Sequence, residues 1–405
     1  PCEHVTRPAE DLKRRHIRHL KDKTDDRHDY RPVYHSQSEA LAAELLAHAD
    51  EPRPQSFGTI MEDLLALTGI LPSIEAGLFD SLDHLNVSGD GSDLECAASP
   101  HGTPTCDCSP EDRMAKRCPH PRQYTSGTAQ WCFSTGKTRY HFGDRYYHIS
   151  VHIPGHDLPL LTRMGEGNEA DFTLSLNALD DMVKMNRDLA LGFTLETFAG
   201  DMHHDTYAFH DYLADKGIKP VIPLRDDASA ASLPHLEGRP ELTLDPDGTP
   251  RCPGGCPMRW HQYHRQKHTH VYTCPAKRLT HRNGKAVYVF HPEDCPNAGD
   301  CCPESTLGPF VYLKPEDDRR FYPEIPRDSK RFTTLYAERT GTERLNAVND
   351  TYHLDRRSRN AAYGLIYLTL ANILEHAVVR RLEQVKRVGS EQALLRQTLA
   401  SLAQA

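Results

Sequence analysis

The pattern of apolar and polar residues divides the chain into helical, strand-like and irregular stretches. Residues 1–57 are polar and rich in helix breakers, and we expect there an arm followed by a helix around residues 38–49. Residues 58–82 carry apolar side chains at helical spacing, which predicts a further helix. From residue 84 the pattern changes to the short runs that are typical of strands.

Residues 84–226 alternate between strands and helices, as a mixed α/β domain does. The expected elements are a strand that ends at Asp90, two strands joined at Pro154 and Gly155, a helix over residues 172–190, a strand that ends at Asp201, a helix over residues 206–217 and a short buried strand over residues 218–226. Gly217 closes the second helix, because glycine readily adopts the left-handed conformation of a helix end. Each candidate carboxylate of this region therefore lies at the end of a strand.

The regular pattern is lost between residues 226 and 330. Short strand-like pieces are visible there at residues 286–290 and 309–313. A helix is predicted from about residue 333 to residue 348. A long helix over residues 361–388 is apolar enough to pack against a sheet and is basic at its end.

The charge of the chain is unevenly distributed. The 405 residues have a formal net charge of −9, which argues mildly against a nucleic-acid partner. Residues 251–292, however, contain no Asp or Glu, and their Lys, Arg and His residues alternate with aromatic residues. This composition is typical of a surface that follows phosphates, and a solvated basic insertion is the alternative. The candidate DNA contacts of this block are Arg259, Arg265, Lys267, Lys277 and Arg278.

The grouping of the 12 cysteines favours metal sites over disulfides. One candidate zinc site, with the short ligand spacings of structural zinc, consists of Cys252, Cys256, Cys274, Cys295, Cys301 and Cys302. A second candidate zinc site consists of Cys106, Cys108, Cys118 and His120. Both segments are poor in apolar residues and would gain most of their order from a metal. Disulfides in a secreted protein and unligated reduced thiols are the alternatives.

The sequence predicts a soluble, cytoplasmic protein. No apolar run approaches the roughly 18 to 20 residues that are needed to cross a bilayer. The first residues of the chain also lack the apolar centre of a signal peptide.

Three patches of the sequence resemble the DDE transposases of bacterial insertion sequences. Residues 86–94, in which Asp90 is followed by Gly and Ser, are similar to the first-strand motif of this family. The alternatives for Asp90 are an ordinary Asp-Gly turn and Asp93 as the residue of the motif. Residues 198–226 are similar to the second motif, with Asp201 at the position of the catalytic aspartate and Asp205 at that of an auxiliary one. The alternative for Asp205 is an N-cap of the next helix.

The third patch, residues 336–350, matches the family signature of Tyr, Arg and Glu. Tyr336, Arg339 and Glu343 have the family spacing, and Asp350 stands where the family has lysine. Because of Asp350, the resemblance does not imply a DNA contact at this last position, whereas the catalytic role that it implies for Glu343 is unaffected. An exposed ion pair of Arg339 and Glu343, which are four residues apart, is the alternative.

The resemblance implies a fold and a division into domains. The expected fold is α/β, with an RNase H-like mixed sheet flanked by helices and a cysteine-rich insertion between the last core strand and the catalytic helix. The implied domains are residues 1–57, an N-terminal arm and helix that is a candidate DNA contact; residues 58–225, the first part of the catalytic domain; residues 226–330, the basic cysteine-rich insertion with a zinc site; and residues 331–405, the catalytic helix and the C-terminal helical part.

The resemblance also implies a chemistry. Transfer of a phosphodiester proceeds by in-line displacement, in which two divalent cations activate the entering oxygen and stabilise the leaving one. Asp90, Asp201 and Glu343 are the expected catalytic residues and ligands of two Mg²⁺ or Mn²⁺ ions, because magnesium prefers hard oxygen donors. Tyr336 and Arg339 are expected to contact the DNA backbone.

The resemblance predicts a DNA transposase that cuts at the ends of a mobile element and joins the freed 3′-hydroxyl to target DNA. Such an enzyme would act on double-stranded DNA as a homodimer, in the bacterial nucleoid. The alternatives are a DNA-binding protein of the same fold without catalysis and an RNase H-like nuclease without strand transfer. Joined products would distinguish the transposase from the nuclease.

Overall fold

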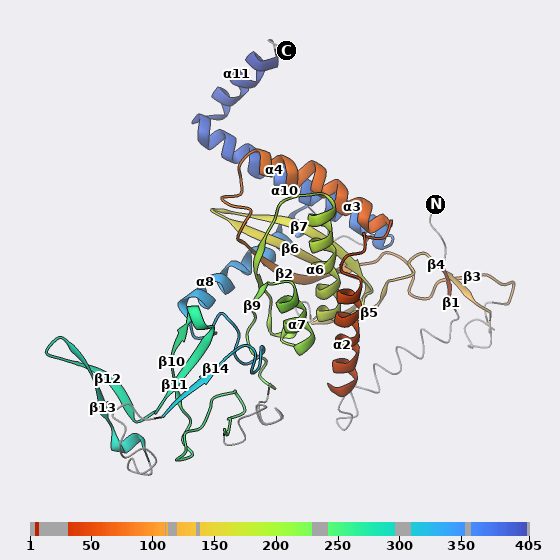
Figure 1. Cartoon of the computed structure of the whole chain (residues 1–405). Coiled ribbons are helices and arrows are strands. Elements are labelled where there is room, and N and C mark those ends of the chain that lie inside the picture. The colour runs from red at the N-terminus through yellow and green to blue at the C-terminus, as the bar shows by residue number, and fades with distance from the viewer. Residues whose placement is uncertain are drawn as a thin grey trace. The chain divides into compact units, whose positions relative to one another are not determined.

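The computed structural model describes residues 5–7, 31–109, 111, 120–134, 138–228, 242–295, 309–352 and 358–402 (Figure 1). The chain divides into two compact units. Unit 1 comprises residues 1–199 and 338–405, and unit 2 comprises residues 200–337. The predicted insertion, residues 226–330, lies within unit 2.

A mixed β-sheet forms the centre of unit 1. Its strands within unit 1 are β2 (Leu85–Glu95), β5 (Gln130–Ser134), β6 (Arg139–Ile153), β7 (His156–Gly165) and β8 (Leu195–Ala199). Strand β6 pairs antiparallel with β5 and β7 on one edge and with β2 on the other, whereas β8 runs parallel to β2. The predicted mixed α/β class is therefore confirmed. A small separate sheet contains β1 (Val5–Arg7), β3 (Thr103–Pro104) and β4 (Arg122–Tyr124).

The helices described in unit 1 include several that the sequence pattern predicts. They are α2 (Arg31–Ala47), α3 (Phe57–Leu65), α4 (Leu71–Glu75), α6 (Asp171–Asp188), α9 (Thr340–Thr351), α10 (Ala361–Val388) and α11 (Glu391–Leu402). A π-helical turn over Ala66–Ile70 joins α3 to α4. Helix α10 has the predicted bounds, because Asn360 caps its start and Gly389, with φ of 87°, ends it.

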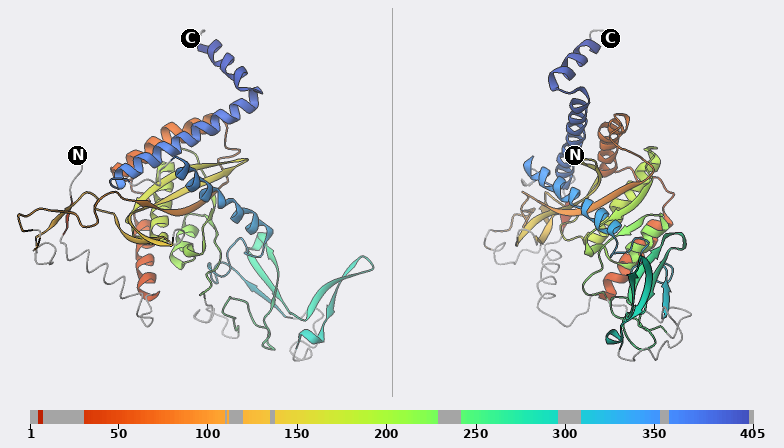
Figure 2. Two further views of the ribbon diagram at one scale, coloured as in Figure 1. Left: turned by 180° about the vertical axis from the view of Figure 1, so that it is seen from behind. Right: turned by 90° about the vertical axis from the view of Figure 1, so that its left-hand side faces the viewer.

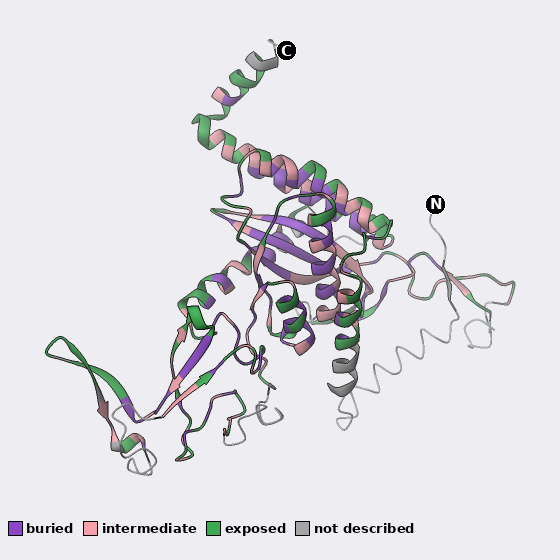
Figure 3. Cartoon of the chain, in the orientation of Figure 1, coloured by how far each residue is buried: buried purple, intermediate pink, exposed green. Residues whose placement is uncertain are grey.

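Helices cover both faces of the sheet, because consecutive residues of a strand point to opposite sides. Leu94 of β2 packs against Leu368 of α10 in a buried cluster on one face. The neighbouring Asp93 lies on the other face, where it contacts Arg145 of β6, and this arginine pairs with Asp171 at the start of α6. Because helices cover both faces of the sheet, the central strands are buried along most of their length (Figure 3).

Two helical segments are long and apolar enough to cross a membrane by length and composition, namely Phe57–Glu75 and Ala361–Val388. The absence of an apolar run of about 18 residues in the sequence predicted no segment of this kind. Helices α3 and α10 pack against each other and against β7 (Figure 2). The most apolar window of the first segment is 33% buried within the structure and that of the second is 44% buried.

Strand β2 is longer than predicted, and this changes the setting of Asp90. The run from Gly89 to Gly91 resembles a turn, yet β2 continues to Glu95 and Asp90 lies opposite His148 of β6. Glycine is required at position 89, because a Cβ atom there would collide with the hydroxyl of Tyr147. Asp90 therefore projects from the middle of a paired strand and not from a strand end.

The helix predicted over residues 333–348 consists of two helices, α8 (Lys330–Glu338) and α9. At the break, the N–H of Thr342 bonds to the carbonyl of Arg339, three residues earlier, at 3.0 Å. The intervening Gly341 lies so close to Asp157 of β7 that a Cβ atom would collide with the carboxylate. The helix is thus interrupted where α9 approaches the sheet.

Unit 2 combines helices with antiparallel strands. Its helix α7 (Tyr207–Asp215) is followed by Gly217 with φ of 69°, as predicted. The strands are β9 (Lys219–Val221), β10 (Arg259–His264), β11 (Thr269–Thr273), β12 (Lys277–Arg282), β13 (Lys285–Phe290) and β14 (Phe310–Leu313). Strands β10, β11 and β14 form one sheet, and β12 pairs with β13 as a hairpin. Strands β13 and β14 confirm the two short strands that were predicted at residues 286–290 and 309–313. Strands β10 and β12 were not predicted, because their basic sequences lack the alternation of apolar and polar residues that is typical of a strand.

A buried histidine joins α10 to the sheet of unit 1. His376 contacts the hydroxyl of Ser73 through Nδ1 at 2.9 Å and the carbonyl of Pro159 through Nε2 at 2.8 Å. Burial lowers the pKa of His376 to about 4, because a charged imidazolium would lose its hydration. The ring is therefore neutral in the folded protein at pH 7.

We expect His376 to make the folded state less stable in acid. Its pKa is about 4 in the folded protein and 6.5 in the unfolded chain, so the unfolded chain binds more protons between these values. The contribution of His376 to stability is complete above pH 6.5 and is lost as the pH falls toward 4, by about 3 kcal/mol. When the free energy of unfolding is measured with urea at pH 7 and at pH 4.5, its decrease between the two pH values should be smaller for His376→Gln than for wild type. The exposed control His84→Gln should follow wild type, and equal losses in wild type and His376→Gln would contradict the prediction.

Candidate functional site

One arginine joins two acidic side chains of unit 1. Arg339, between α8 and α9, has its Nη1 atom 3.7 Å from Oδ1 of Asp90 and its Nη2 atom 2.6 Å from Oε1 of Glu343. The side chain of Arg339 is only 15% exposed, whereas that of Glu343 is 48% exposed. The ion pair of Arg339 and Glu343 is therefore not an isolated surface pair, because the arginine also contacts the central strand.

Asn346, which is absent from the sequence motif, lies one turn after Glu343 and donates from Nδ2 to Oδ2 of Asp90 at 3.2 Å. Its Oδ1 atom is buried and has no hydrogen-bond partner among the described residues. Buried amide oxygens are normally satisfied, and a hard cation or a donor on a ligand would satisfy this one. Oxygen donors of this kind, on Asp90, Glu343 and Asn346, are the ligand type that a hard cation takes.

A buried hydroxyl cluster fixes the start of α9 on the sheet. The hydroxyl of Thr342 lies 2.7 Å from that of Ser88 on β2 and 2.7 Å from that of Ser150 on β6. Ser88 precedes Asp90 by two residues and therefore shares its face of the sheet. The cluster thereby sets the position of α9 relative to Asp90.

Further contacts hold the rest of α9. Asn349 bonds to the buried His148 at 2.9 Å, and Arg344 forms a two-point ion pair with Asp157 at 2.7 and 2.9 Å. The residues that α9 directs at the sheet recur at the spacing of one helix face and are Thr342, Asn346 and Asn349. This spacing of small polar residues is the signal in the sequence that could have revealed Asn346.

Asp201 belongs to unit 2 and follows the last residue of β8. Strand β8 ends at Ala199, two residues earlier than predicted, and Ala199 pairs with Ser88 of β2. Asp201 thus follows Ala199 by the same number of residues as Asp90 follows Ser88.

The carboxylate of Asp201 caps the short turn that follows it. It accepts a hydrogen bond from the N–H of His203 at 3.0 Å and contacts Nδ1 of the buried His204 at 2.7 Å. Burial opposes ionisation of Asp201, but the contact with His204 and the charges of both histidines hold its pKa at about 2. Asp201 is therefore an anion at neutral pH, as a ligand of a hard cation must be.

Asp205 is a buried anchor of unit 2. Thr206, and not Asp205, caps helix α7. The carboxylate of Asp205 has no exposed surface and accepts hydrogen bonds from Arg320 at 2.8 Å and from the N–H of Arg225 at 2.9 Å, with His210 at 3.1 Å. Burial opposes its ionisation, but the bonds from His210 and Arg320 hold its pKa well below the usual range. The N-cap interpretation of Asp205 is therefore wrong, and the auxiliary-site interpretation stays a prediction.

Most candidate DNA contacts of the basic block are exposed. The exposed side chains are those of Arg259, Arg265, Lys267 and Arg278. Lys277 differs from the prediction of an exposed DNA contact, because this residue is only 7% exposed at the start of β12. Tyr336 stacks on Phe332 in α8, with 5.7 Å between the ring centroids.

Four cysteines of unit 2 lie close enough to influence one another. Cys252, Cys274 and Cys295 are buried, and Cys274 and Cys295 share one cluster. A tight turn brings Cys256 back toward Cys252, whose N–H bonds to the Cys256 carbonyl at 2.8 Å. Burial raises the pKa of the Cys256 thiol, and the nearby Cys252, Cys295 and Cys274 raise it further. A tetrathiolate zinc ion requires such a grouping. Cys301 and Cys302 lie outside the described residues.

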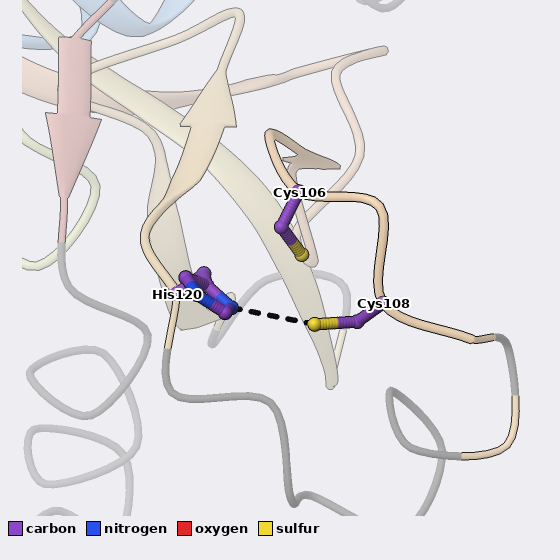
Figure 4. A group of neighbouring side chains, drawn as sticks. All are labelled: Cys106, Cys108 and His120. Carbon is purple, nitrogen blue, oxygen red and sulfur yellow. Dashed lines mark hydrogen bonds between the residues drawn. The ribbon is translucent and has the colours of Figure 1, made fainter.

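Three members of the other predicted zinc site are also neighbours. The ligand atoms of Cys106, Cys108 and His120 lie within 4.8 Å of one another, and Cys108 Sγ is 3.4 Å from Nδ1 of His120 (Figure 4). Cys118 lies outside the described residues. All cysteines that the structure describes are free of disulfides, which counts against the disulfide alternative.

No protein-family model matches the chain, and no curated protein matches it.

Proposed function

We propose that the chain is a DDE transposase, which cuts DNA at the ends of a mobile element and joins the 3′-hydroxyl ends to target DNA. The observation that carries the proposal is the contact of Arg339 with both Asp90 and Glu343. It brings the arginine and glutamate of the signature helix to the aspartate of the first strand. Asp90 is far from Arg339 and Glu343 in the sequence, and a purely structural ion pair would not require both carboxylates.

The arrangement of the sheet supports the same proposal. Strands β7, β6 and β2 are neighbours with antiparallel pairing, and β8 adds to β2 in parallel. An RNase H-like sheet has this order, and we infer that unit 1 is of this type. The cysteine-rich part of unit 2 corresponds in this proposal to the insertion before the catalytic helix.

The residues have separate tasks in the proposed reaction. Two Mg²⁺ or Mn²⁺ ions, when bound, activate the entering oxygen and stabilise the leaving one. Asp90 and Glu343 would hold these ions, with Asp201 as the third ligand that the resemblance implies, and Asn346 orients Asp90 through its hydrogen bond. Arg339 neutralises the two carboxylates when cations are absent and can pair with a DNA phosphate when cations replace it.

The proposed partner is double-stranded DNA, at the element ends and at the target, with a homodimer as the active form in the nucleoid. The exposed basic side chains of unit 2 would follow the phosphates, which predicts strong dependence of binding on salt. Structural zinc at the four thiols would hold the segment that carries these side chains.

An assay of DNA cleavage and joining tests the proposal. The substrate is a duplex with the terminal sequence found beside the gene for this chain, and the target is a plasmid. With Mg²⁺ or Mn²⁺, wild type should produce both nicked and joined DNA, and Asp201→Asn should lose both by roughly 10²-fold or more. Asp83→Asn, the same exchange at an exposed loop residue, should keep both activities.

The other outcomes separate the alternatives. Cleavage without joined products would support the RNase H-like nuclease. Tight binding of the duplex without cleavage by wild type would support the catalytically silent DNA-binding protein. Equal activity in wild type and Asp201→Asn would reject the proposed site.

A further inference from the structure

A separate group of metal-ligating side chains lies in the sheet of unit 1. Asp93, Cys132 and His141 come from the strands β2, β5 and β6, and their ligand atoms lie within 4.8 Å of one another. Cys132 Sγ is 2.9 Å from Nε2 of His141, and Oδ1 of Asp93 is 4.0 Å from the same nitrogen. We propose that these three side chains bind a zinc ion.

Strand pairing makes this group a fixed part of the sheet. Cys132 and His141 are direct partners in the pairing of β5 with β6, so their side chains lie on the same face. Asp93 pairs with a residue of β6 that lies an even number of positions from His141 and shares that face. Asp90 is three residues before Asp93 and faces the opposite side. The proposed zinc site is therefore distinct from the candidate active site.

Two of the three side chains in this group are buried, as the ligands of a preformed metal site are. Cys132 is 8% exposed and His141 is 5% exposed. Asp93 is 17% exposed as a side chain and forms the more open side of the group, where water can supply a fourth ligand. Side chains from adjacent strands have little freedom to move apart, so the ligands are held near one another before an ion binds.

The geometry does not fit a cysteine nucleophile activated by histidine. In such a site the acid binds the ring nitrogen that faces away from the nucleophile. Here Asp93 and Cys132 both lie nearest to Nε2 of His141, because Nδ1 is 3.7 Å from the sulfur. A sulfur and an oxygen atom that converge on one imidazole nitrogen are arranged as ligands around an ion.

The donor set and the local charge select zinc. Thiolate and imidazole favour zinc over magnesium. One thiolate and one carboxylate neutralise a Zn²⁺ ion, and the adjacent charges of Arg145 and Asp171 pair with each other at 2.9 Å. Arg145 also lies 3.4 Å from Asp93 and partly neutralises its carboxylate, and a bound zinc ion would take over part of this neutralisation.

Only small movements are required for coordination. Bond lengths around tetrahedral zinc place a sulfur and a nitrogen ligand ~3.5 Å apart and an oxygen and a nitrogen ligand ~3.3 Å apart. The observed separations of 2.9 and 4.0 Å bracket these values. Side-chain rotation alone can supply the difference. The ion would then link β5 to β2 through β6, close to where the pairing of β2 with β6 ends at Glu95.

Zinc content of the full chain tests the proposal. Wild type, Cys132→Ser and the control Cys96→Ser are purified with zinc, dialysed, and measured for bound zinc and for folding by circular dichroism. Cys96 is also a buried free cysteine, at the end of β2, but is not part of the group. We expect Cys132→Ser to bind one zinc ion fewer per chain than wild type and Cys96→Ser to bind as many as wild type.

A second variant keeps the test decisive if Cys132→Ser does not fold. Asp93→Asn preserves the size of the side chain and removes the charged ligand, and it should lower the affinity of one zinc ion by at least about tenfold. Equal zinc content and affinity in folded wild type and folded Cys132→Ser or Asp93→Asn would overturn the proposal. The assay does not involve DNA, so its outcome is independent of the proposed transposase activity.

Discussion

Replacing Asp90 with asparagine is expected to lower metal-dependent DNA cleavage by at least about 10³-fold. The exchange removes one negative charge at the point where β2 meets α9, and a neutral amide is a poor substitute for a carboxylate that holds a divalent cation. Folding should be little affected. The side chain of Asp90 is 23% exposed, and an amide oxygen can still accept the hydrogen bond from Asn346. The free energy of unfolding should therefore change by less than about 1 kcal/mol.

Single-turnover cleavage and urea unfolding, measured on the same preparations, check this prediction. Asp83→Asn provides the matched control, because it makes the same chemical change at an exposed residue of the preceding loop. A folded Asp90→Asn protein that cleaves at a rate within threefold of wild type would show that Asp90 does not hold a catalytic ion.

Replacing Cys274 with serine is expected to unfold the part of unit 2 that contains β10 to β14. Structural zinc in small cysteine-rich segments provides about 10 to 16 kcal/mol of apparent binding free energy, which is also folding free energy. Cys274 is 2% exposed and shares a small buried cluster with Cys295. The described core of this part has few large apolar residues, and its main cluster is that of Leu313, Phe321 and Tyr322. The free energy lost with the zinc ion should therefore be larger than the stabilisation that the remaining apolar packing provides.

Limited proteolysis of the full chain measures this effect. In Cys274→Ser, and in wild type treated with a strong zinc chelator, cleavage within residues 259–295 should become at least about tenfold faster, while the sheet of unit 1 stays protected. Cys96→Ser serves as the control for loss of a buried thiol. Unchanged protection in Cys274→Ser, combined with unchanged zinc content, would show that the four cysteines are ordinary reduced thiols.

Local patterns of sequence were sufficient for several elements. The apolar periodicity of residues 361–388, bounded by Asn360 and Gly389, predicted helix α10 at its observed bounds. The turn at Pro154 and Gly155 correctly separated β6 from β7, because Gly155 has φ of 83°. These patterns depend only on residues that are neighbours in the sequence. The predicted helix and turn form in the folded protein because the tertiary contacts favour the same local conformations.

Other features depended on contacts that no local pattern encodes. Asp90 lies in a sequence that favours a turn, but pairing with β6 extends the strand beyond it. Lys277 is basic and was expected at the surface, yet the start of β12 is buried. Asp205 has the sequence position of a helix cap and instead binds Arg320, which is 115 residues away.

From the sequence alone came the mixed α/β class, the helices with regular periodicity, the clusters of cysteine, and the three motifs with their acidic residues. These depend on side-chain spacing over a few turns of helix or a few residues of strand. The tertiary structure alone decided that Arg339 contacts both Asp90 and Glu343, that Asn346 donates a hydrogen bond to Asp90, and that Asp93, Cys132 and His141 share one face of the sheet. The physical reason is that these contacts arise from the pairing of strands and the docking of α9, which bring together residues with no regular separation along the chain.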